Sequence, residues 1–255
     1  MVVFLTGATS GLGEALARHY VARGATLGLL ARREHELSRL ERDLAPASVA
    51  TYTGDVRDAG VLARAGADFL ARFGTPDIVI GNAGVSRGTL TQLAEDIPAF
   101  RAVFETNVMG LVHTFQPFVQ AMIDAKRGAL VGIASVAGFR GIPGSGAYSG
   151  SKAAAIAYLE SLRVELRTSG VAVVTVCPGY IATPMTANNP YGMPFLLQPD
   201  KAARLVAGAI ERRKRFYVLP WPMAIAGCAL RWLPRGIFDR VFENAKRKPR
   251  SEGTG

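Results

Sequence analysis

Short apolar runs alternate with longer amphipathic stretches along most of the 255-residue chain. The runs have the length of buried strands, and the stretches between them carry the three-to-four-residue apolar spacing of helices. Strands joined in this way by helices pair in parallel, with helices covering both faces of the sheet. The pattern therefore predicts an α/β fold built on a single doubly wound parallel sheet. The expected strands are Val2–Leu5, Thr26–Ala31, Val49–Thr53, Asp77–Gly81, Ala129–Ala134, Val171–Val176 and Phe216–Leu219.

The helical stretches have uneven lengths, and one of them, Ala99–Ala125, is expected to be a single long helix. No internal repeat and no Gly/Ser-rich linker divides the chain, so one domain is the simplest organisation. We expect residues 1–219 to form the sheet domain and residues 220–255 to be a helical extension of it. The other expected helices are Glu14–Arg23, Glu34–Asp43, Tyr148–Ser169, Lys201–Arg213 and, in the extension, Arg235–Lys246.

Positive charge is concentrated at the C-terminal end. The chain has a net charge of +10, but residues 1–200 hold 17 Lys/Arg against 16 Asp/Glu, whereas residues 201–255 hold 13 against 4. The sheet domain is therefore almost neutral, and whatever the charge does is local to the last quarter. No motif or interleaved aromatic pattern accompanies it, so nucleic-acid binding is not predicted.

The extension has two interpretations that the sequence leaves open. Its apolar run Met223–Leu230 is too short and too close to prolines to span a bilayer, which takes about 20 residues. With Trp221, Trp232 and flanking arginines, it could lie in a membrane interface. It could equally pack on the sheet or on a partner subunit. The basic residues 246–250 that follow are expected to be frayed.

Composition narrows the class of protein further. At 49% hydrophobic and 20% charged residues, the chain is expected to be globular rather than disordered. Cys177 and Cys228 have neither metal-site spacing nor framework partners, so no metal site is predicted and a reducing compartment is favoured. Val2–Leu5 leads straight into a glycine turn and does not resemble a signal peptide. We therefore expect a cytoplasmic protein, with membrane association at the inner face as the open alternative.

A glycine-rich turn separates the first strand from the first helix. Gly7, Gly11 and Gly13 allow close approach of a ligand to the backbone, and the helix start offers free N–H groups to a pyrophosphate. The spacing G-x3-G-x-G differs from the general dinucleotide fingerprint. Its position between a strand and a helix nevertheless favours a dinucleotide site.

The end of the second strand reads Ala31-Arg32-Arg33, where an acidic residue that binds the ribose 2′-hydroxyl is the common choice. A guanidinium can bind a 2′-phosphate that a carboxylate would repel. We therefore expect NADP(H) to be preferred, with NAD(H) as the weaker alternative. The arginines could also simply open the next helix.

Two further strand ends carry candidate cofactor contacts. Asp55, after the third strand, could accept a hydrogen bond from the adenine amino group or cap the following helix. Asn82-Ala83-Gly84, after the fourth strand, suits a flat ligand lying on the backbone, although a plain turn would look the same.

The segment Ser135 to Lys152 supplies the candidate reaction chemistry. Tyr148 and Lys152 are one helical turn apart and share a helix face. A free tyrosine titrates near pKa ~10, and an ammonium about 4 Å away at an effective dielectric of about 20 favours the phenolate by roughly 4 kcal/mol. That attraction, less the cost of desolvation, predicts a tyrosine tuned for proton transfer. Cys177 has no basic group positioned to activate it and is expected to be a packed small residue.

These motifs together resemble the short-chain dehydrogenase/reductase family over about residues 1–215. The resemblance implies a Rossmann-type fold and hydride transfer between a nicotinamide cofactor and a carbonyl or secondary alcohol. It rests on Thr6-Gly7-x3-Gly11-x-Gly13, Asn82-Ala83-Gly84, Asn107, Ser135, Tyr148-x3-Lys152, Pro178-Gly179 and Thr183.

The resemblance also implies residue roles. Tyr148 would be the general acid/base, Ser135 would orient the substrate oxygen, and Lys152 would tune Tyr148 and hold the nicotinamide ribose. Asn107 would hold a water on a proton path from Lys152. Residues 186–198 would form a flap over the substrate, and the apolar content of this flap suggests an apolar substrate. The remaining cofactor contacts are expected at Thr9, Ser10, Leu12, Val56, Ala83, Pro178, Gly179, Ile181 and Thr183.

Two further expectations follow from the family. Ala99–Ala125 and Tyr148–Ser169 would form the face of a homodimer or homotetramer. A cofactor-binding sensor or scaffold without turnover remains the alternative function, although the complete set of Asn107, Ser135, Tyr148 and Lys152 disfavours it.

Overall fold

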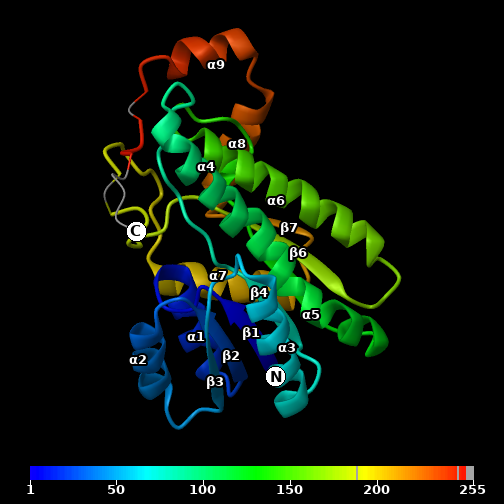
Figure 1. Ribbon diagram of the computed structural model, residues 1–255. Coiled ribbons are helices and arrows are strands. Elements are labelled where there is room, and N and C mark those ends of the chain that lie inside the picture. The colour runs from blue at the N-terminus through cyan, green and yellow to red at the C-terminus, as the bar shows by residue number, and fades with distance from the viewer. Residues whose placement is uncertain (188, 246, 251–255) are drawn as a thin grey trace.

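A computed structural model describes residues 1–187, 189–245 and 247–250. Its centre is a seven-stranded sheet in the order β3-β2-β1-β4-β5-β6-β7, and every neighbouring pair of strands is parallel (Figure 1). The Rossmann-type doubly wound sheet expected from the sequence is therefore confirmed. Its strands are β1 Val2–Thr6, β2 Thr26–Ala31, β3 Val49–Thr53, β4 Ile78–Gly81, β5 Ala129–Ile133, β6 Ala172–Pro178 and β7 Phe216–Leu219.

Helices cover both faces of the sheet, and each face has its own apolar core. One core joins the sheet to α1 Gly11–Val21, α2 Glu34–Leu44 and α7 Pro199–Glu211. The other joins it to α3 Ala59–Phe73, α5 Gly110–Asp124 and α6 Gly146–Glu165. Because side chains alternate between the two faces of a strand, strands buried on both faces need apolar residues throughout. This explains why the strands are unbroken apolar runs in the sequence.

The chain changes direction at the centre of the sheet. β1 pairs with β2 on one side and with β4 on the other, so the crossovers to β2 and β3 and those to β5, β6 and β7 extend in opposite directions. In doubly wound sheets, the carboxyl ends of the strands at such a switch point border a crevice that binds ligands. The topology therefore places a candidate site beside the ends of β1 and β4.

The long helix expected over Ala99–Ala125 is wrong as a single element. The structure divides it into α4 Ile97–Phe104, a π-helical turn Glu105–Met109, and α5. The buried Asn107 lies in that turn, and its side chain binds backbone outside the helix. A π-helical turn of this kind is often found at functional sites.

The C-terminal extension forms α8 Trp221–Trp232 and α9 Arg235–Phe242, which lie beyond the β7 edge of the sheet (Figure 1). The inner side of α8 packs closely on the domain: Met223 lies against Gly179, and Gly227 lies against the ring of Phe139. Within the described residues, no helix has the length and apolar character needed to cross a membrane. One side of α8 thus packs on the protein, while its other side stays exposed.

Residues 247–250, expected to be frayed, instead lie across the loop that follows β4. We call this segment the C-terminal strap. Lys248 Nζ donates to Ser86 Oγ at 2.8 Å, and the Arg250 guanidinium binds both carboxylate oxygens of Asp96 at 2.9–3.0 Å. Asp96 in turn accepts from the Leu90 backbone N–H at 2.7 Å. The expectation failed because these partners are about 160 residues earlier in the sequence.

The strap contacts predict local protection of the loop around Leu90. In Arg250→Ala, amide hydrogen exchange over residues 85–90 should be faster than in the wild type, because Asp96 loses the cation that orients it. Hydrogen bonds from Arg250 and from the Leu90 N–H lower the pKa of Asp96. The protection should therefore be present at neutral pH and disappear as the pH falls through that lowered pKa.

Arg163→Ala is the matched control, since it removes an exposed arginine that pairs only with Glu160 of its own helix among the described residues. Equal exchange over residues 85–90 in the wild type and in Arg250→Ala would contradict the strap.

Candidate active site

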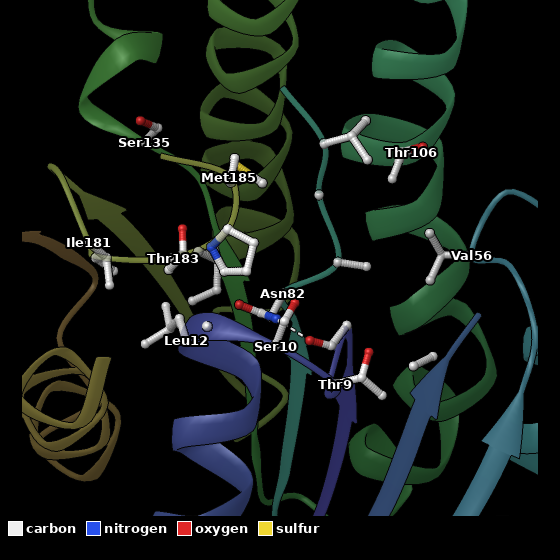
Figure 2. A pocket seen from close by; sticks show the side chains of 18 of the residues that line it. Thr9, Ser10, Leu12, Val56, Asn82, Thr106, Ser135, Ile181, Thr183 and Met185 are labelled. Carbon is white, nitrogen blue, oxygen red and sulfur yellow. Dashed lines mark hydrogen bonds between the residues drawn. The ribbon is translucent and has the colours of Figure 1, made fainter. Parts of the chain in front are cut away.

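A cavity of about 490 Å³ opens at the carboxyl ends of the strands, where the switch point places it. Figure 2 shows Thr9, Ser10 and Leu12 at the start of α1, with Ser135 and Met185 across the cavity from them. Of the residues expected at the site, only Gly13 and Asn107 do not line it. The others are Gly7, Thr9, Ser10, Gly11, Leu12, Arg32, Arg33, Asp55, Val56, Asn82, Ala83, Gly84, Ser135, Tyr148, Lys152, Pro178, Gly179, Ile181 and Thr183.

The glycine turn holds the start of α1 close to the first strand. Gly7 has φ +69°, a left-handed conformation that favours glycine. A Cβ on Gly13 would lie 2.1 Å from the Gly7 carbonyl oxygen, so any larger residue would force the helix away. Ser10 precedes the helix, but its hydroxyl makes no capping hydrogen bond. The first N–H groups of α1 therefore remain available to an anion at the cavity.

Asn82 fastens this turn to the end of β4. Its Nδ2 donates to the carbonyl oxygens of Thr6 at 3.1 Å and Gly7 at 3.0 Å. The Ala83 N–H reaches the Thr6 hydroxyl at 3.4 Å. Asn82 is thus more than the plain turn former left open by the sequence, because its amide joins the two strands on either side of the crevice.

Positive charge collects at the far end of the cavity, beyond β2 and β3. Arg33 extends over the glycine turn and donates to Thr9 Oγ1 at 3.2 Å, while Arg32 lies 3.7 Å from the Asp55 carboxylate. Arg57 binds the same carboxylate at 2.7 Å. Two guanidinium groups thus share a single carboxylate, and a third lies over the glycine turn, so this end of the cavity can accept a further anion.

Asp55 is not the helix cap that the sequence left open. Asp58 caps α3, where its Oδ1 accepts from the Gly60 N–H at 2.8 Å and the Val61 N–H at 3.3 Å. Burial raises the pKa of Asp55, but hydrogen bonds from Arg57 outweigh that effect and hold it below its usual value. Asp55 therefore remains ionised at the cavity wall.

Ser135 has both a structural and a cavity-lining position. Its Oγ accepts from the Ala137 N–H at 3.1 Å and so caps the short 3-10 turn Val136–Gly138. The same hydroxyl lies 3.4 Å from the Pro178 carbonyl oxygen, at the end of β6. Ser135 therefore caps this turn, and its hydroxyl still borders the cavity.

Tyr148 and Lys152 lie on the same face of α6, as their spacing predicted, with Lys152 Nζ 5.9 Å from the centre of the Tyr148 ring. Lys152 is only 4% exposed, and its ammonium donates to the Ile133 carbonyl oxygen at 2.8 Å. Its Nζ lies 3.4 Å from the position that a Cβ on Gly84 would occupy. The absence of a side chain at Gly84 thus keeps space beside the ammonium.

The expected lowering of the Tyr148 pKa is wrong. Burial raises the pKa of Tyr148, and the neighbouring Ser135 hydroxyl offsets only part of that rise. Burial also lowers the pKa of Lys152 to about 8, since a buried ammonium is penalised. Desolvation, whose cost the sequence could not supply, thus sets the direction of both pKa shifts.

Asn107 stands behind the cavity wall and organises it. Its Oδ1 accepts from the Val85 N–H at 2.8 Å, and its Nδ2 donates to the Val85 carbonyl oxygen and to Ser151 Oγ, both at 2.9 Å. Ser151 in turn donates to the Tyr148 carbonyl oxygen at 2.8 Å. Asn107 therefore joins the loop after β4 to the helix that carries Tyr148 and Lys152.

Several residues at the site were not predicted from the sequence. Ser151 gives no signal of its own because serines are common on helices, whereas Val85 could have been suspected directly after Asn82-Ala83-Gly84. Thr106 and the segment from Pro184 onward depend on how distant loops fold. Thr186 lines the cavity as the first residue of the expected flap, and the unpredicted lining residues are Leu30, Ala31, Gly54, Val85, Thr106, Ile133, Ala134, Pro184 and Met185.

Cys177 is fully buried beside the site, and burial raises the pKa of its thiol to about 12. The thiolate is the nucleophilic form of cysteine, so this side chain is unreactive at neutral pH. The expectation that Cys177 is a packed small residue is confirmed.

A sheet of this topology, with an open helix start, a narrow glycine turn and a Tyr–Lys pair on one helix face at the cleft, defines a nucleotide-binding oxidoreductase fold. The family model for short chain dehydrogenase matches residues 1–192. The chain belongs to the short-chain dehydrogenase/reductase family. It is accordingly an NAD(P)-dependent oxidoreductase that acts on a small-molecule substrate.

Individual relatives agree with this assignment. An "Uncharacterized oxidoreductase" of Myxococcus xanthus is 37% identical over 237 residues, covering 92% of this chain and 93% of the relative. The Bos taurus dehydrogenase/reductase SDR family member 7B is 34% identical over 269 residues, covering 98% of this chain and 82% of the bovine protein. A solved actinorhodin polyketide ketoreductase with NADPH is 28% identical, with a TM-score of 0.77, over 85% of this chain and 94% of that structure.

The residues of the cavity fit a nicotinamide dinucleotide. Gly13 lies where a side chain would clash, and the open start of α1 provides N–H donors suited to a pyrophosphate. The Gly13→Ala substitution should therefore weaken NADPH binding, because it displaces α1 from the turn. It should also lower the free energy of unfolding by about 1–3 kcal/mol, as overpacking does.

Fluorescence titration with NADPH and urea unfolding would measure the two effects. Gly236→Ala in α9 is the matched control, because a Cβ there meets no atom within 4 Å. Wild-type NADPH affinity in Gly13→Ala would contradict the proposed contact between the turn and the cofactor.

Proposed function

We propose that this protein is an NADP(H)-dependent carbonyl reductase or alcohol dehydrogenase, which transfers a hydride between NADP(H) and a carbonyl or secondary alcohol. The observation that carries the proposal is the convergence of Ser135, Tyr148 and Lys152 on a single cavity that also contains the glycine turn. A phenol, a hydroxyl and an ammonium at one site are the groups that proton transfer to a developing alkoxide requires.

Each side chain then has a chemical task. When bound, the nicotinamide supplies the hydride in reduction and accepts it in oxidation. Tyr148 donates a proton to the substrate oxygen during reduction and accepts it during oxidation. Ser135 donates a hydrogen bond to that oxygen, whose negative charge grows as the carbonyl is reduced. Lys152 places positive charge beside Tyr148 and offers hydrogen bonds to the nicotinamide ribose.

The proton equilibria favour the reductive direction at neutral pH. Because burial raises the pKa of Tyr148, its hydroxyl is protonated there and ready to act as an acid. Oxidation needs the phenolate form of Tyr148. At pH values below the pKa of Tyr148, the phenolate population increases about tenfold with each unit by which the pH rises. The two protonation states of Tyr148 thus support the two directions of the reaction, and reduction is favoured near neutral pH.

Asn107 is proposed to support a proton path from Lys152. The support comes from its position: its Oδ1 and Lys152 Nζ lie 3.3 and 3.4 Å from the same point above Gly84. A water beside Gly84, farther from its Cα than a Cβ would be, is proposed to bind both groups, in addition to the backbone contacts of Asn107 with Val85. Such a water would supply Tyr148 with protons from solvent through Lys152.

The preference for NADP(H) is proposed from the charge beyond β2. Arg32, Arg33 and Arg57 outnumber Asp55, and the Arg33 guanidinium already reaches the glycine turn. A 2′-phosphate would add the anion that this group of charges lacks, and arginine can bind it with paired hydrogen bonds. The actinorhodin ketoreductase structure contains NADPH, which is consistent with this choice.

The substrate is proposed to be apolar around its carbonyl. Ile181 and Met185 project into the cavity near Thr183 (Figure 2), and Phe195 and Leu196 are exposed on the same loop segment. The enzyme is also proposed to act as a homodimer or homotetramer. Exposed Phe100 on α4 and Val164 on α6 support that assembly, because these helices were the expected subunit face.

Tyr148→Phe should leave NADPH affinity unchanged and lower kcat for carbonyl reduction by roughly 10²- to 10⁴-fold, the usual contribution of a general acid. A panel of ketones, steroids, sugars and acyl chains, followed by loss of NADPH fluorescence, first identifies a substrate, and kcat is then compared. Tyr158→Phe removes a hydroxyl from the same helix outside the cavity and should behave as wild type.

The pH profile gives a second readout of the same proposal. Wild-type oxidation should accelerate as the pH rises from 7, because the phenolate becomes populated, and this rise should be absent in Tyr148→Phe. Unchanged turnover in Tyr148→Phe would remove the phenol from the chemistry. NADPH binding without turnover across the panel would favour the sensor or scaffold alternative.

Arg33→Ala should weaken NADPH binding by about 10- to 100-fold, since a hydrogen bond to a charged group contributes roughly 1.5–3 kcal/mol. Its affinity for NADH should change little, because NADH has no 2′-phosphate. Dissociation constants for both cofactors, measured by fluorescence, test this. Arg72→Ala, which removes an exposed arginine paired with Asp68 on α3, is the control. Equal loss for both cofactors in Arg33→Ala would contradict 2′-phosphate recognition.

A further inference from the structure

The outer side of α8 carries an apolar stripe. Trp221, Ile225, Cys228 and Trp232 follow one another at intervals of four, three and four residues, which places them on one side of a helix. Trp221 is 73% exposed, Ile225 63% and Trp232 80%. A helix on the surface of a soluble domain normally turns polar side chains toward solvent, whereas α8 turns apolar side chains toward solvent.

The packed side of α8 is a different one. Met223 and Gly227, one helical turn apart, are its buried residues and contact Gly179 and Phe139 of the domain. The stripe therefore cannot be buried by a small rotation of the helix without removing these contacts. An apolar inner side and an apolar outer side together indicate that α8 lies between the protein and a second apolar partner.

The outer side of α9 repeats the pattern. Ile237 and Val241 are 53% and 62% exposed and lie one turn apart. The inner side is occupied by Phe238 and Phe242, whose rings stack at 4.4 Å, and the Arg140 guanidinium lies 4.6 Å from the Phe238 ring. We define the apolar face as the five outward residues Trp221, Ile225, Trp232, Ile237 and Val241. Figure 1 shows both helices at one end of the molecule, away from α2 and α3.

The charge around the apolar face is mainly positive. Arg231, Arg235 and Arg240 are exposed on or beside the two helices. Over residues 221–250, the sequence contains seven Lys/Arg against Asp239 and Glu243. An exposed apolar patch bordered by cations is suited to a partner with an apolar interior and an anionic surface.

We propose that the apolar face of α8 and α9 docks in the interface of an anionic phospholipid bilayer, and that this cytoplasmic protein is held at the inner face of a membrane. Trp221 and Trp232 are separated by about 17 Å along α8, at 1.5 Å per residue. If α8 lies flat, both indoles rest at the headgroup level where tryptophan is enriched, and the arginines meet anionic headgroups. A second copy of the chain fits less well, because a two-fold contact through this face would bring like charges together.

Vesicle flotation of the full chain tests the proposal. The wild type should float with phosphatidylcholine vesicles that contain phosphatidylglycerol, and more weakly with phosphatidylcholine alone. The triple variant Trp221→Ser, Ile225→Ser, Trp232→Ser should lower the partition coefficient at least roughly tenfold, because most of the exposed apolar area of α8 is lost. Arg235→Gln with Arg240→Gln should weaken binding to the anionic vesicles alone.

The matched control is Ile97→Ser at the start of α4, which removes a side chain of similar exposure, 61%, outside the apolar face. Circular dichroism confirms that each variant is folded. No flotation of the wild type, or equal flotation of the wild type and the triple variant, would overturn the proposal. The proposal would also be overturned if the triple variant had a lower molar mass in solution than the wild type and the wild type did not bind vesicles. The apolar face would then contact a second copy of the chain.

The result does not depend on the proposed reaction. NADPH affinity, measured by fluorescence, should be the same in the triple variant and the wild type, because no substituted residue lines the cavity. A protein that binds vesicles but does not turn over any carbonyl would retain the membrane site and lose only the proposed function.

Discussion

The shape of the site depends on a contact that holds β1 and β4 together, at the place where the chain leaves these two strands toward opposite edges of the sheet. β1 and β4 are neighbours at the centre of the sheet, yet the chain leaves them toward opposite edges. The Asn82 amide joins them by donating to the carbonyl oxygens of Thr6 and Gly7. A Cβ on Gly13 would also clash with that amide, at 2.6 Å from Asn82 Nδ2. A single side chain thus fixes the glycine turn, the start of α1 and the end of β4, and with them the shape of the cleft.

The chemistry at the other end of the cleft is governed by desolvation. Burial of Lys152 lowers its pKa to about 8, and burial of Tyr148 raises its pKa, so the site favours a neutral phenol. The Ile133 carbonyl oxygen partly compensates the buried ammonium. A protein that buries both groups therefore keeps a proton on Tyr148 at neutral pH, and conditions that favour the phenolate must come from higher pH or from a bound partner.

Much of the fold could be predicted because buried parallel strands are continuous apolar runs. The bounds of β2, β3 and β7 agree with the sequence pattern, and the expected cleft residues other than Gly13 and Asn107 line one cavity. The failures involve distant partners or solvation. The π turn depends on Val85, 22 residues from Asn107, and the strap depends on Asp96, 154 residues from Arg250. The pKa of Tyr148 depends on burial, which no local spacing reveals.

The C-terminal strap has a consequence for biosynthesis. Its partners, Ser86 and Asp96, belong to the first half of the chain, whereas residues 247–250 leave the ribosome only after α9 has been made. Because chains begin to fold from the N-terminus during translation, the sheet and its cleft can assemble while the loop after β4 is still uncovered. The nascent chain can thus hold a folded nucleotide half while the loop after β4 is still unfastened.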